Sequence, residues 1–347
     1  LDSGYSPATI IVDAPIEINT PQGVWRPQNS SNQYYGPTPL RTGIERSRNL
    51  MTIRLAQEVG MDVVGAYAEK FGVYDDLLPV LANALGSQET TLFKMVAAYA
   101  MFANGGERVE PTLVDRVQDR YGKTVYRHDE RVCDDCNDLN LPLGQAPRVI
   151  SNRERVMNEI TAYQLTSMLE GVVQRGSGAR TVNLPVPIAG KTGTTNSAKD
   201  VWFVGFSSNI VAGCYIGYDN PKSLGSGAFG GSMCGPVFNQ FMGEAIQKYG
   251  GGPFNVPADC QFIPIDRFTG ARLPDGASGE NVIAECFRPG EVPIFGIAYD
   301  GGFGMAADLP LFDEVPRSAR SVTTSTGGTA TVGPKASFGS LSSGGLY

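Results

Sequence analysis

The sequence is poor in histidine, in basic side chains and in long apolar runs. It has one histidine in 347 residues, and 28 Lys and Arg against 35 Asp and Glu, for a formal net charge of −7. No Lys/Arg-rich stripe is present, which argues against nucleic acid as a partner. No run approaches the roughly 18 consecutive apolar residues of a membrane span. Neither a metal nor another cofactor is expected, because no set of ligands with suitable spacing is found.

The chain does have an ordinary globular composition, 41% apolar and 18% charged, and six cysteines. An even number of cysteines fits an oxidising compartment, although a cytosolic protein could carry six buried thiols. Cys133 and Cys136 with His128 could form half a zinc site, but a loop disulfide is favoured because no second histidine exists. A second bridge is expected between Cys260 and Cys286. The remaining two, Cys214 and Cys234, either pair or lie in the core.

Apolar residues at helical spacing predict four helices. One begins near Asn49 and runs to 59, and a second covers 92–103 and ends at Asn104-Gly105-Gly106. A third is predicted from Thr161-x-x-Gln164, which has the form of a capping box, to about 174. The fourth follows Pro236 and ends before Gly250.

Beyond residue 200 the apolar period changes from 3.6 to 2. Residues 201–206 and 210–218 are rich in β-branched and aromatic residues and are joined by Ser207-Ser208-Asn209, which predicts an antiparallel hairpin. A short strand is also expected over 9–12. Helices cluster before residue 180 and strands follow it. The order predicts an α+β fold with an antiparallel sheet packed against helices, and does not fit alternating βαβ units.

Composition also suggests how the chain is divided. Residues 1–250 are expected to form one domain, in which 107–150 is a surface excursion that carries the Cys133–Cys136 pair. Residues 251–314 are punctuated by Pro and Gly and predict a small C-terminal β appendage. The segment 315–347 is rich in Ser, Thr and Gly, and disorder is expected there.

Gly190-Lys191-Thr192 resembles the end of a phosphate-binding P-loop. A P-loop needs a glycine five residues before this one, and Pro185 stands there. The motif also precedes a predicted hairpin instead of the helix that would hold the phosphate at its N-terminus. A nucleotide-binding protein is therefore disfavoured.

An edge strand beside a ligand is the better interpretation of residues 191–194, although a plain surface turn fits the tripeptide alone. Such a strand offers an ammonium group, hydroxyls and backbone N–H groups, and Gly193 leaves room for a ligand backbone. A partner motif, Ser47-Arg48-Asn49, stands at the start of the first predicted helix, where Ser or Asn ordinarily caps. Ser-x-Asn followed by Lys-Thr-Gly is the pattern of penicillin-binding proteins and serine β-lactamases.

Longer stretches strengthen this pattern. LDSGYSPAT, YYGPTPLRTGIERSRN, ALGSQETTLFKMVAAYAMFANGG, ITAYQLTSMLEGVVQRGSGAR and AGKTGTTNSAKDVWFVGF occur in this order. Over residues 1–249 the chain resembles the transpeptidase domain of class A (bifunctional) penicillin-binding proteins. The resemblance implies the fold shared with serine β-lactamases, and a peptidoglycan D,D-transpeptidase that crosslinks stem peptides through a serine acyl-enzyme.

The same resemblance implies roles for single residues. Ser47 would relay a proton to the departing amine, Asn49 would hold an amide of the donor peptide, and Lys191 would set the charge of the site and support proton transfer. In the strand that follows the motif, Asp200 and Trp202 are interpreted as structural, the first as a turn residue and the second as packing.

The remaining implied contacts are to the substrate. Thr192 and Thr194 would bind the terminal carboxylate of the peptide or of a β-lactam, and the backbone N–H of Thr194 would supply half of an oxyanion hole. Gly193 and Thr195 are expected to line the same substrate-binding strand.

One element of the family is missing. No lysine of the chain has a serine three residues before it, so there is no Ser-x-x-Lys to supply a nucleophile. Thr91-x-x-Lys94 has the spacing but lies where the family has packing residues. We expect the nucleophile upstream of Leu1, together with a glycosyltransferase domain and a membrane anchor in the parent protein. The chain alone is then expected to form no acyl-enzyme.

The expected partners are D-Ala-D-Ala stem peptides and β-lactams, on the periplasmic side of the bacterial cytoplasmic membrane. Two alternatives remain open at this point. A D,D-carboxypeptidase or β-lactamase-type hydrolase would use water as the acyl acceptor, and a non-catalytic binding or sensor domain of the same fold would need no nucleophile.

Overall fold

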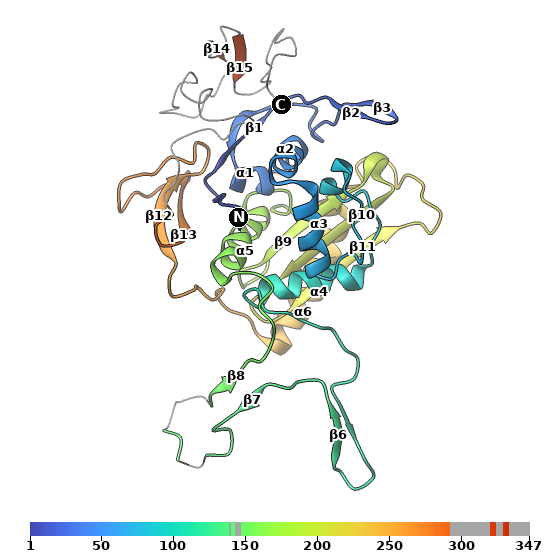
Figure 1. The fold of residues 1–347 in the computed structure, drawn as a ribbon, viewed down its shortest axis with the longest axis vertical. Coiled ribbons are helices and arrows are strands. Elements are labelled where there is room, and N and C mark those ends of the chain that lie inside the picture. The colour runs from blue at the N-terminus through green and yellow to red at the C-terminus, as the bar shows by residue number, and fades with distance from the viewer. Residues whose placement is uncertain (139, 143–146, 292–319, 324–328, 333–347) are drawn as a thin grey trace.

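Three strands form the central sheet of the structure, a computed structural model that describes residues 1–138, 140–142, 147–291, 320–323 and 329–332 (Figure 1). They are β9 (Ala189–Thr194), β10 (Asp200–Phe206) and β11 (Val211–Gly217), all antiparallel in the order β11-β10-β9. The predicted hairpin is thus confirmed. The Lys-Thr-Gly segment lies on β9, at the edge of the sheet among the described residues.

Helices cover both faces of this sheet (Figure 1). α6 (Gly230–Tyr249) packs on one face, and α4 (Leu92–Ala103) with α5 (Glu159–Gln174) packs on the other. Strand side chains alternate between faces, so Phe203 contacts Phe238 of α6 while Phe206 contacts Tyr99 of α4. The α+β class, with an antiparallel sheet packed against helices, is confirmed.

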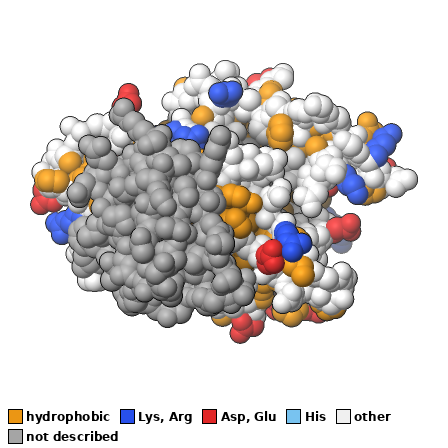
Figure 2. All heavy atoms as spheres, turned by 90° about the horizontal axis from the view of Figure 1, so that it is seen from above, with side chains coloured by type: hydrophobic (Ala, Val, Ile, Leu, Met, Phe, Trp, Pro, Cys, Tyr) orange, Lys and Arg blue, Asp and Glu red, His pale blue; other side chains and the backbone are white. Residues whose placement is uncertain are grey.

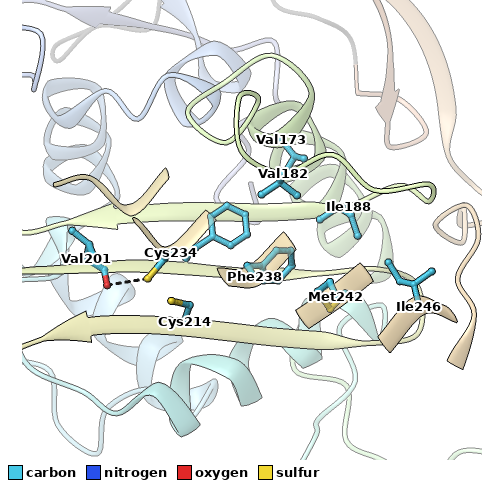
Figure 3. Close-up of a cluster of buried hydrophobic side chains, with 10 residues drawn as sticks. Val173, Val182, Ile188, Val201, Cys214, Cys234, Phe238, Met242 and Ile246 are labelled. Atoms are coloured by element: carbon cyan, nitrogen blue, oxygen red, sulfur yellow. Dashed lines mark hydrogen bonds between the residues drawn. The ribbon is translucent and has the colours of Figure 1, made fainter. Parts of the chain in front are cut away.

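The cysteines occupy three environments. Cys133–Cys136 and Cys260–Cys286 are disulfides, as predicted, so the zinc alternative for Cys133 and Cys136 is wrong. Cys214 and Cys234 are buried thiols in the core under α6, where Figure 3 shows them between the sheet and the helix. The Cys234 thiol donates to the carbonyl of Val201 at 3.5 Å, and burial raises its pKa.

The N-terminal part combines short strands and helices. β1 (Ile10–Asp13) pairs with β4 (Gly36–Pro39), and β2 (Ile18–Thr20) pairs with β3 (Gly23–Trp25) between them. The helical elements that follow are α1 (Leu40–Glu45), α2 (Asn49–Val59), α3 (Met61–Lys70) and the short 3₁₀ helix η1 (Leu81–Leu85). The strand and the helix predicted in this region, β1 and α2, are confirmed.

The excursion predicted at 107–150 stands away from the rest of the molecule (Figure 1). Its strands pair two by two, β5 (Arg116–Gln118) with β6 (Thr124–Arg127), and β7 (Val132–Cys133) with β8 (Val149–Ile150). Apart from Cys133, the residues of these strands are exposed.

The C-terminal segment contacts the N-terminal part of the chain through a hairpin. β12 (Gln261–Asp266) and β13 (Val282–Phe287) form a hairpin whose Ile265 and Phe287 pack against Ala8. Further on, β14 (Arg320–Thr323) pairs with β15 (Thr329–Val332), and the disorder expected for 315–347 stays a prediction. All of 292–314 and the other residues of the predicted tail lie outside the described residues.

A buried ion pair joins this hairpin to α1. Arg41 and Glu285 are 1% and 0% exposed, and the guanidinium donates to both carboxylate oxygens of Glu285, at 2.5 and 2.7 Å. Arg41 also donates to the carbonyl of Ser167 in α5 at 3.0 Å and approaches Glu45 at 3.4 Å. Glu45 in turn accepts from Arg175 at 2.6 Å. Four charged groups therefore link three separate parts of the chain.

Two predicted helix starts are wrong. α5 begins at Glu159, because Asn158 caps it by accepting from Ile160 N at 2.9 Å. Thr161 is therefore inside the helix, and Gln164 donates to the carbonyl of Cys286 at 2.9 Å instead of closing a capping box. α6 begins at Gly230, before Pro236. Glycine is required there, since a Cβ on Gly230 would lie 2.2 Å from the carbonyl oxygen of Trp202.

The described surface is mixed in charge. In Figure 2, Lys/Arg and Asp/Glu side chains are scattered singly or in pairs over the part of the face that the structure describes. Among all the residues that the structure describes, no helix combines the length and the apolar character needed to cross a membrane.

Candidate active site

The two predicted motifs meet in space through Ser47 and Lys191. The Lys191 ammonium donates to Ser47 Oγ at 2.7 Å and to the carbonyl of Thr192 at 3.0 Å. Lys191 is paired with Val204 across the sheet, and successive residues of β9 point to opposite faces. Lys191 therefore points toward the loop between α1 and α2, while Thr192 and Thr194 point toward the start of α6.

The surroundings of Lys191 favour its neutral form. Burial lowers the pKa of its ammonium from 10.5 to about 8. At neutral pH the group is still mostly protonated, but a proton can leave it far more easily than it leaves an ordinary lysine. An acid of this strength in contact with a hydroxyl is suited to proton relay.

The depressed pKa predicts a pH-dependent stability. Below about pH 8 the folded chain bears the full cost of burying the charged ammonium, because both states are protonated. As the pH rises from about 8 toward 10.5, the folded state loses this proton before the unfolded state does, so the free energy of unfolding rises. Urea titrations of the wild type and of Lys191→Met over this range measure the effect. The difference in unfolding free energy between the two proteins should change between pH 8 and 10.5. A constant difference would contradict the lowered pKa of Lys191.

Ser47 lies in a strained part of the chain. Its φ of 54° is in the left-handed region, which residues other than glycine seldom adopt. The alternative interpretation of this motif, that Ser47 or Asn49 caps α2, does not hold, because the N-cap residue is Arg48 and its side chain makes no capping hydrogen bond. The Asn49 side chain instead donates to the carbonyl of Gln28 at 2.8 Å.

A residue that the motifs did not indicate joins β9. Ser177 Oγ lies 2.7 Å from Thr192 Oγ1, in the loop that follows α5. Its backbone N–H donates to the carbonyl of Glu45 at 3.2 Å, which holds this loop against α1. The only signal in the sequence was the Gly176-Ser177-Gly178 end of the third predicted helix, which gave no reason to connect it with Lys-Thr-Gly.

The other predicted residues of β9 are placed differently. Thr194 Oγ1 accepts from Gly230 N at 3.0 Å, at the start of α6. The Thr195 hydroxyl donates its proton to the carbonyl of Asp200 at 3.1 Å and accepts from the backbone N–H of Asp200 at 2.9 Å. A Cβ on Gly193 would lie 3.1 Å from Trp202 Cβ, so the glycine also makes room for this indole.

The packing role predicted for Trp202 is confirmed, whereas Asp200, interpreted as a turn residue, is the first residue of β10. Trp202 Nε1 donates to the Asp200 carboxylate at 3.3 Å, and the indole packs edge-on against Tyr215, with ring centroids 4.8 Å apart. Among the described residues no cluster of His, Cys, Asp or Glu has the composition of a metal site.

Comparison with known proteins places this geometry in a family. A family model described as "Penicillin binding protein transpeptidase domain" matches residues 1–243. Two curated proteins named penicillin-binding protein 1A are similar. The one from Rickettsia typhi is 43% identical over 280 residues, 80% of this chain and 36% of its own length. The one from Rickettsia prowazekii is 40% identical over 320 residues, 91% of this chain and 39% of its own length.

A solved structure is similar as well. The crystal structure of penicillin-binding protein 1A from Haemophilus influenzae superimposes with a TM-score of 0.68 at 30% identity, over 82% of this chain and 45% of that chain. The chain therefore spans less than half the length of each of these relatives.

Proposed function

The chain belongs to the penicillin-binding protein transpeptidase domain family, and from this premise we propose that Ser47, Lys191 and the threonines of β9 form one wall of a peptidoglycan D,D-transpeptidase site. The resemblance drawn from the motifs is confirmed over residues 1–243. The observation that carries the proposal is the 2.7 Å contact between Lys191 Nζ and Ser47 Oγ, which joins the two motifs.

The contact provides a path for a proton. When a serine nucleophile acylates on the D-Ala-D-Ala carbonyl, the C–N bond to the terminal D-Ala breaks and its nitrogen needs a proton. The Ser47 hydroxyl can give its own proton to that nitrogen and take one from the Lys191 ammonium. Lys191 then becomes neutral, which its lowered pKa of about 8 favours.

The hydroxyls on the other side of β9 can bind a carboxylate. Thr194 Oγ1 accepts from Gly230 N, so its own proton is free to be donated. Ser177 and Thr192 share one hydrogen bond, which uses one of their two protons. Two donors remain, one for each oxygen of a terminal carboxylate. We assign no ligand contact to the Thr195 hydroxyl, because Asp200 occupies it.

No residue of the chain is assigned as the nucleophile, since no lysine follows a serine at the required spacing. The test is labelling by a fluorescent penicillin, applied to this chain and to the complete gene product that contains it. The gene product should be labelled at one serine and the 347-residue chain should not. Labelling of the chain alone would overturn this part of the proposal, and an unlabelled gene product would overturn the proposed function.

A second assay separates crosslinking from hydrolysis. The gene product is incubated with a stem pentapeptide that ends in D-Ala-D-Ala and with an acceptor amine. A transpeptidase yields the crosslinked dimer, and a carboxypeptidase or β-lactamase-type enzyme yields the shortened peptide only. A sensor domain binds penicillin and releases no D-Ala. Ser151→Ala, at an exposed position directly after the excursion, is a suitable control for Ser47→Ala.

The place of action follows from the proposed substrate. Peptidoglycan is assembled outside the cytoplasmic membrane, so we propose that the protein acts on its periplasmic side. The two disulfides agree with an oxidising compartment.

A further inference from the structure

The N-terminus of α2, next to Ser47, is capped by a residue that is distant in the sequence. Its N-cap residue, Arg48, offers no side-chain acceptor to the first N–H groups. Asn29 supplies one instead: its Oδ1 accepts from Asn49 N at 2.9 Å and from Leu50 N at 3.4 Å. Asn29 is twenty residues earlier than Asn49 in the chain, and it is only 3% exposed.

The same amide is fixed from its other end. Asn29 Nδ2 donates to both oxygens of the Asp13 carboxylate, at 2.7 and 2.9 Å, and to the carbonyl of Gln33 at 2.9 Å. Asp13 lies on β1 and is fully buried. Every polar atom of the Asn29 side chain is thus satisfied, and the amide cannot rotate without losing contacts at both ends.

The hydrogen bonds of Asn29 hold the segment that carries the Ser47-Arg48-Asn49 motif. The neighbouring carbonyl, that of Gln28, accepts from the Asn49 side chain at 2.8 Å. Ser47 keeps a left-handed φ of 54°, a conformation that persists only where the surroundings hold it. Arg48, between them, lies 3.9 Å from Asp13 and 3.3 Å above the ring of Tyr35.

We propose that Asn29, oriented by Asp13, is the positioning residue that holds Ser47 and Asn49 in register with Lys191. The inference rests on the proposed function. Asn29 touches no reacting group, so its effect on the reaction is expected to come through the position of Ser47. A displacement of about 1 Å in such a group can cost roughly a hundredfold in rate.

The test measures acylation of the gene product by a fluorescent penicillin at a temperature where every variant is folded. Asn29→Ala should lower the first-order acylation rate constant about tenfold or more, with little change in the binding constant. Ile53→Ala is the matched control, because Ile53 is buried in the middle of the same helix. It should lower the melting temperature and leave the rate within about twofold.

Exchanging the residues at positions 13 and 29 tests the contact between Asn29 and Asp13 specifically. Asn29→Asp keeps an acceptor for α2 but places a carboxylate against Asp13. Adding Asp13→Asn restores a donor at position 13 for the new carboxylate, so the double variant should be faster than Asn29→Asp alone. The proposal is overturned if Asn29→Ala acylates like the wild type, if its loss only parallels that of Ile53→Ala, or if the double variant recovers nothing.

A readout without activity separates this inference from the proposed function. Loosening of the Ser47 loop would admit water to Lys191, so Asn29→Ala should move the NMR titration midpoint of Lys191 upward from about 8. If the wild-type gene product is not acylated, the proposed function fails, and an unmoved midpoint would then also overturn the positioning role.

Discussion

Lys191→Met should lower the rate of penicillin acylation of the gene product by about 10²–10⁴-fold, the range expected for loss of a general acid–base group. The ammonium is in contact with Ser47 Oγ, and with its pKa lowered to about 8 it can return a proton to that hydroxyl. Met has a similar length and no proton to give. The variant also removes the positive charge that would attract a carboxylate to β9.

Two further variants sharpen this prediction. Lys191→Arg keeps the charge but not the ability to lose a proton near neutral pH, so a strong loss in Lys191→Arg assigns the effect to proton transfer. Recovery of most of the rate would assign it to charge. Lys199→Met, at an exposed position eight residues further along, should be neutral. Stopped-flow acylation measures all three, and a wild-type rate in Lys191→Met would exclude the relay.

Arg41→Ala should lower the free energy of unfolding by about 3–5 kcal/mol, the cost of breaking a buried ion pair by removal of one partner. The substitution leaves Glu285, 0% exposed, without its two charge-assisted hydrogen bonds. It also removes the donor to the carbonyl of Ser167. Glu45 keeps Arg175, so the uncompensated charge is that of Glu285. Urea denaturation followed by circular dichroism measures the change.

The controls for this prediction come from the C-cap of the same helix and from the same ion pair. Arg46→Ala, an exposed neighbour, should change the unfolding free energy by less than about 0.5 kcal/mol. Arg41→Met combined with Glu285→Met should recover much of the loss, because the double change leaves no buried charge at the pair. If Arg41→Ala is as stable as Arg46→Ala, the C-terminal hairpin is not held by this pair.

The sequence could predict the β10–β11 hairpin, the helices α2 and α4 and the strand β9, because each depends on residues close together in the chain. The alternation of β-branched and aromatic residues in 201–206 and 211–217 is itself the condition for a strand with two covered faces. Thr91 and the Asn104-Gly105-Gly106 stop bound α4 by contacts within a few residues. The start of α5 was predicted wrongly because a capping box and an internal Thr and Gln have the same local pattern.

The chemistry of Lys191 and Ser47 as a pair was suggested by their motifs, but their contact depends on the tertiary structure, since 144 residues separate them. The sequence by itself determined the residue types, the strand alternation and the family. Only the tertiary structure decided that Asn29 caps α2, that Ser177 joins Thr192 and that Arg41 binds Glu285, 244 residues away. The reason is physical: local patterns report which face of an element is apolar, whereas a buried polar group is satisfied by whatever partner the packing of distant segments brings within hydrogen-bond distance.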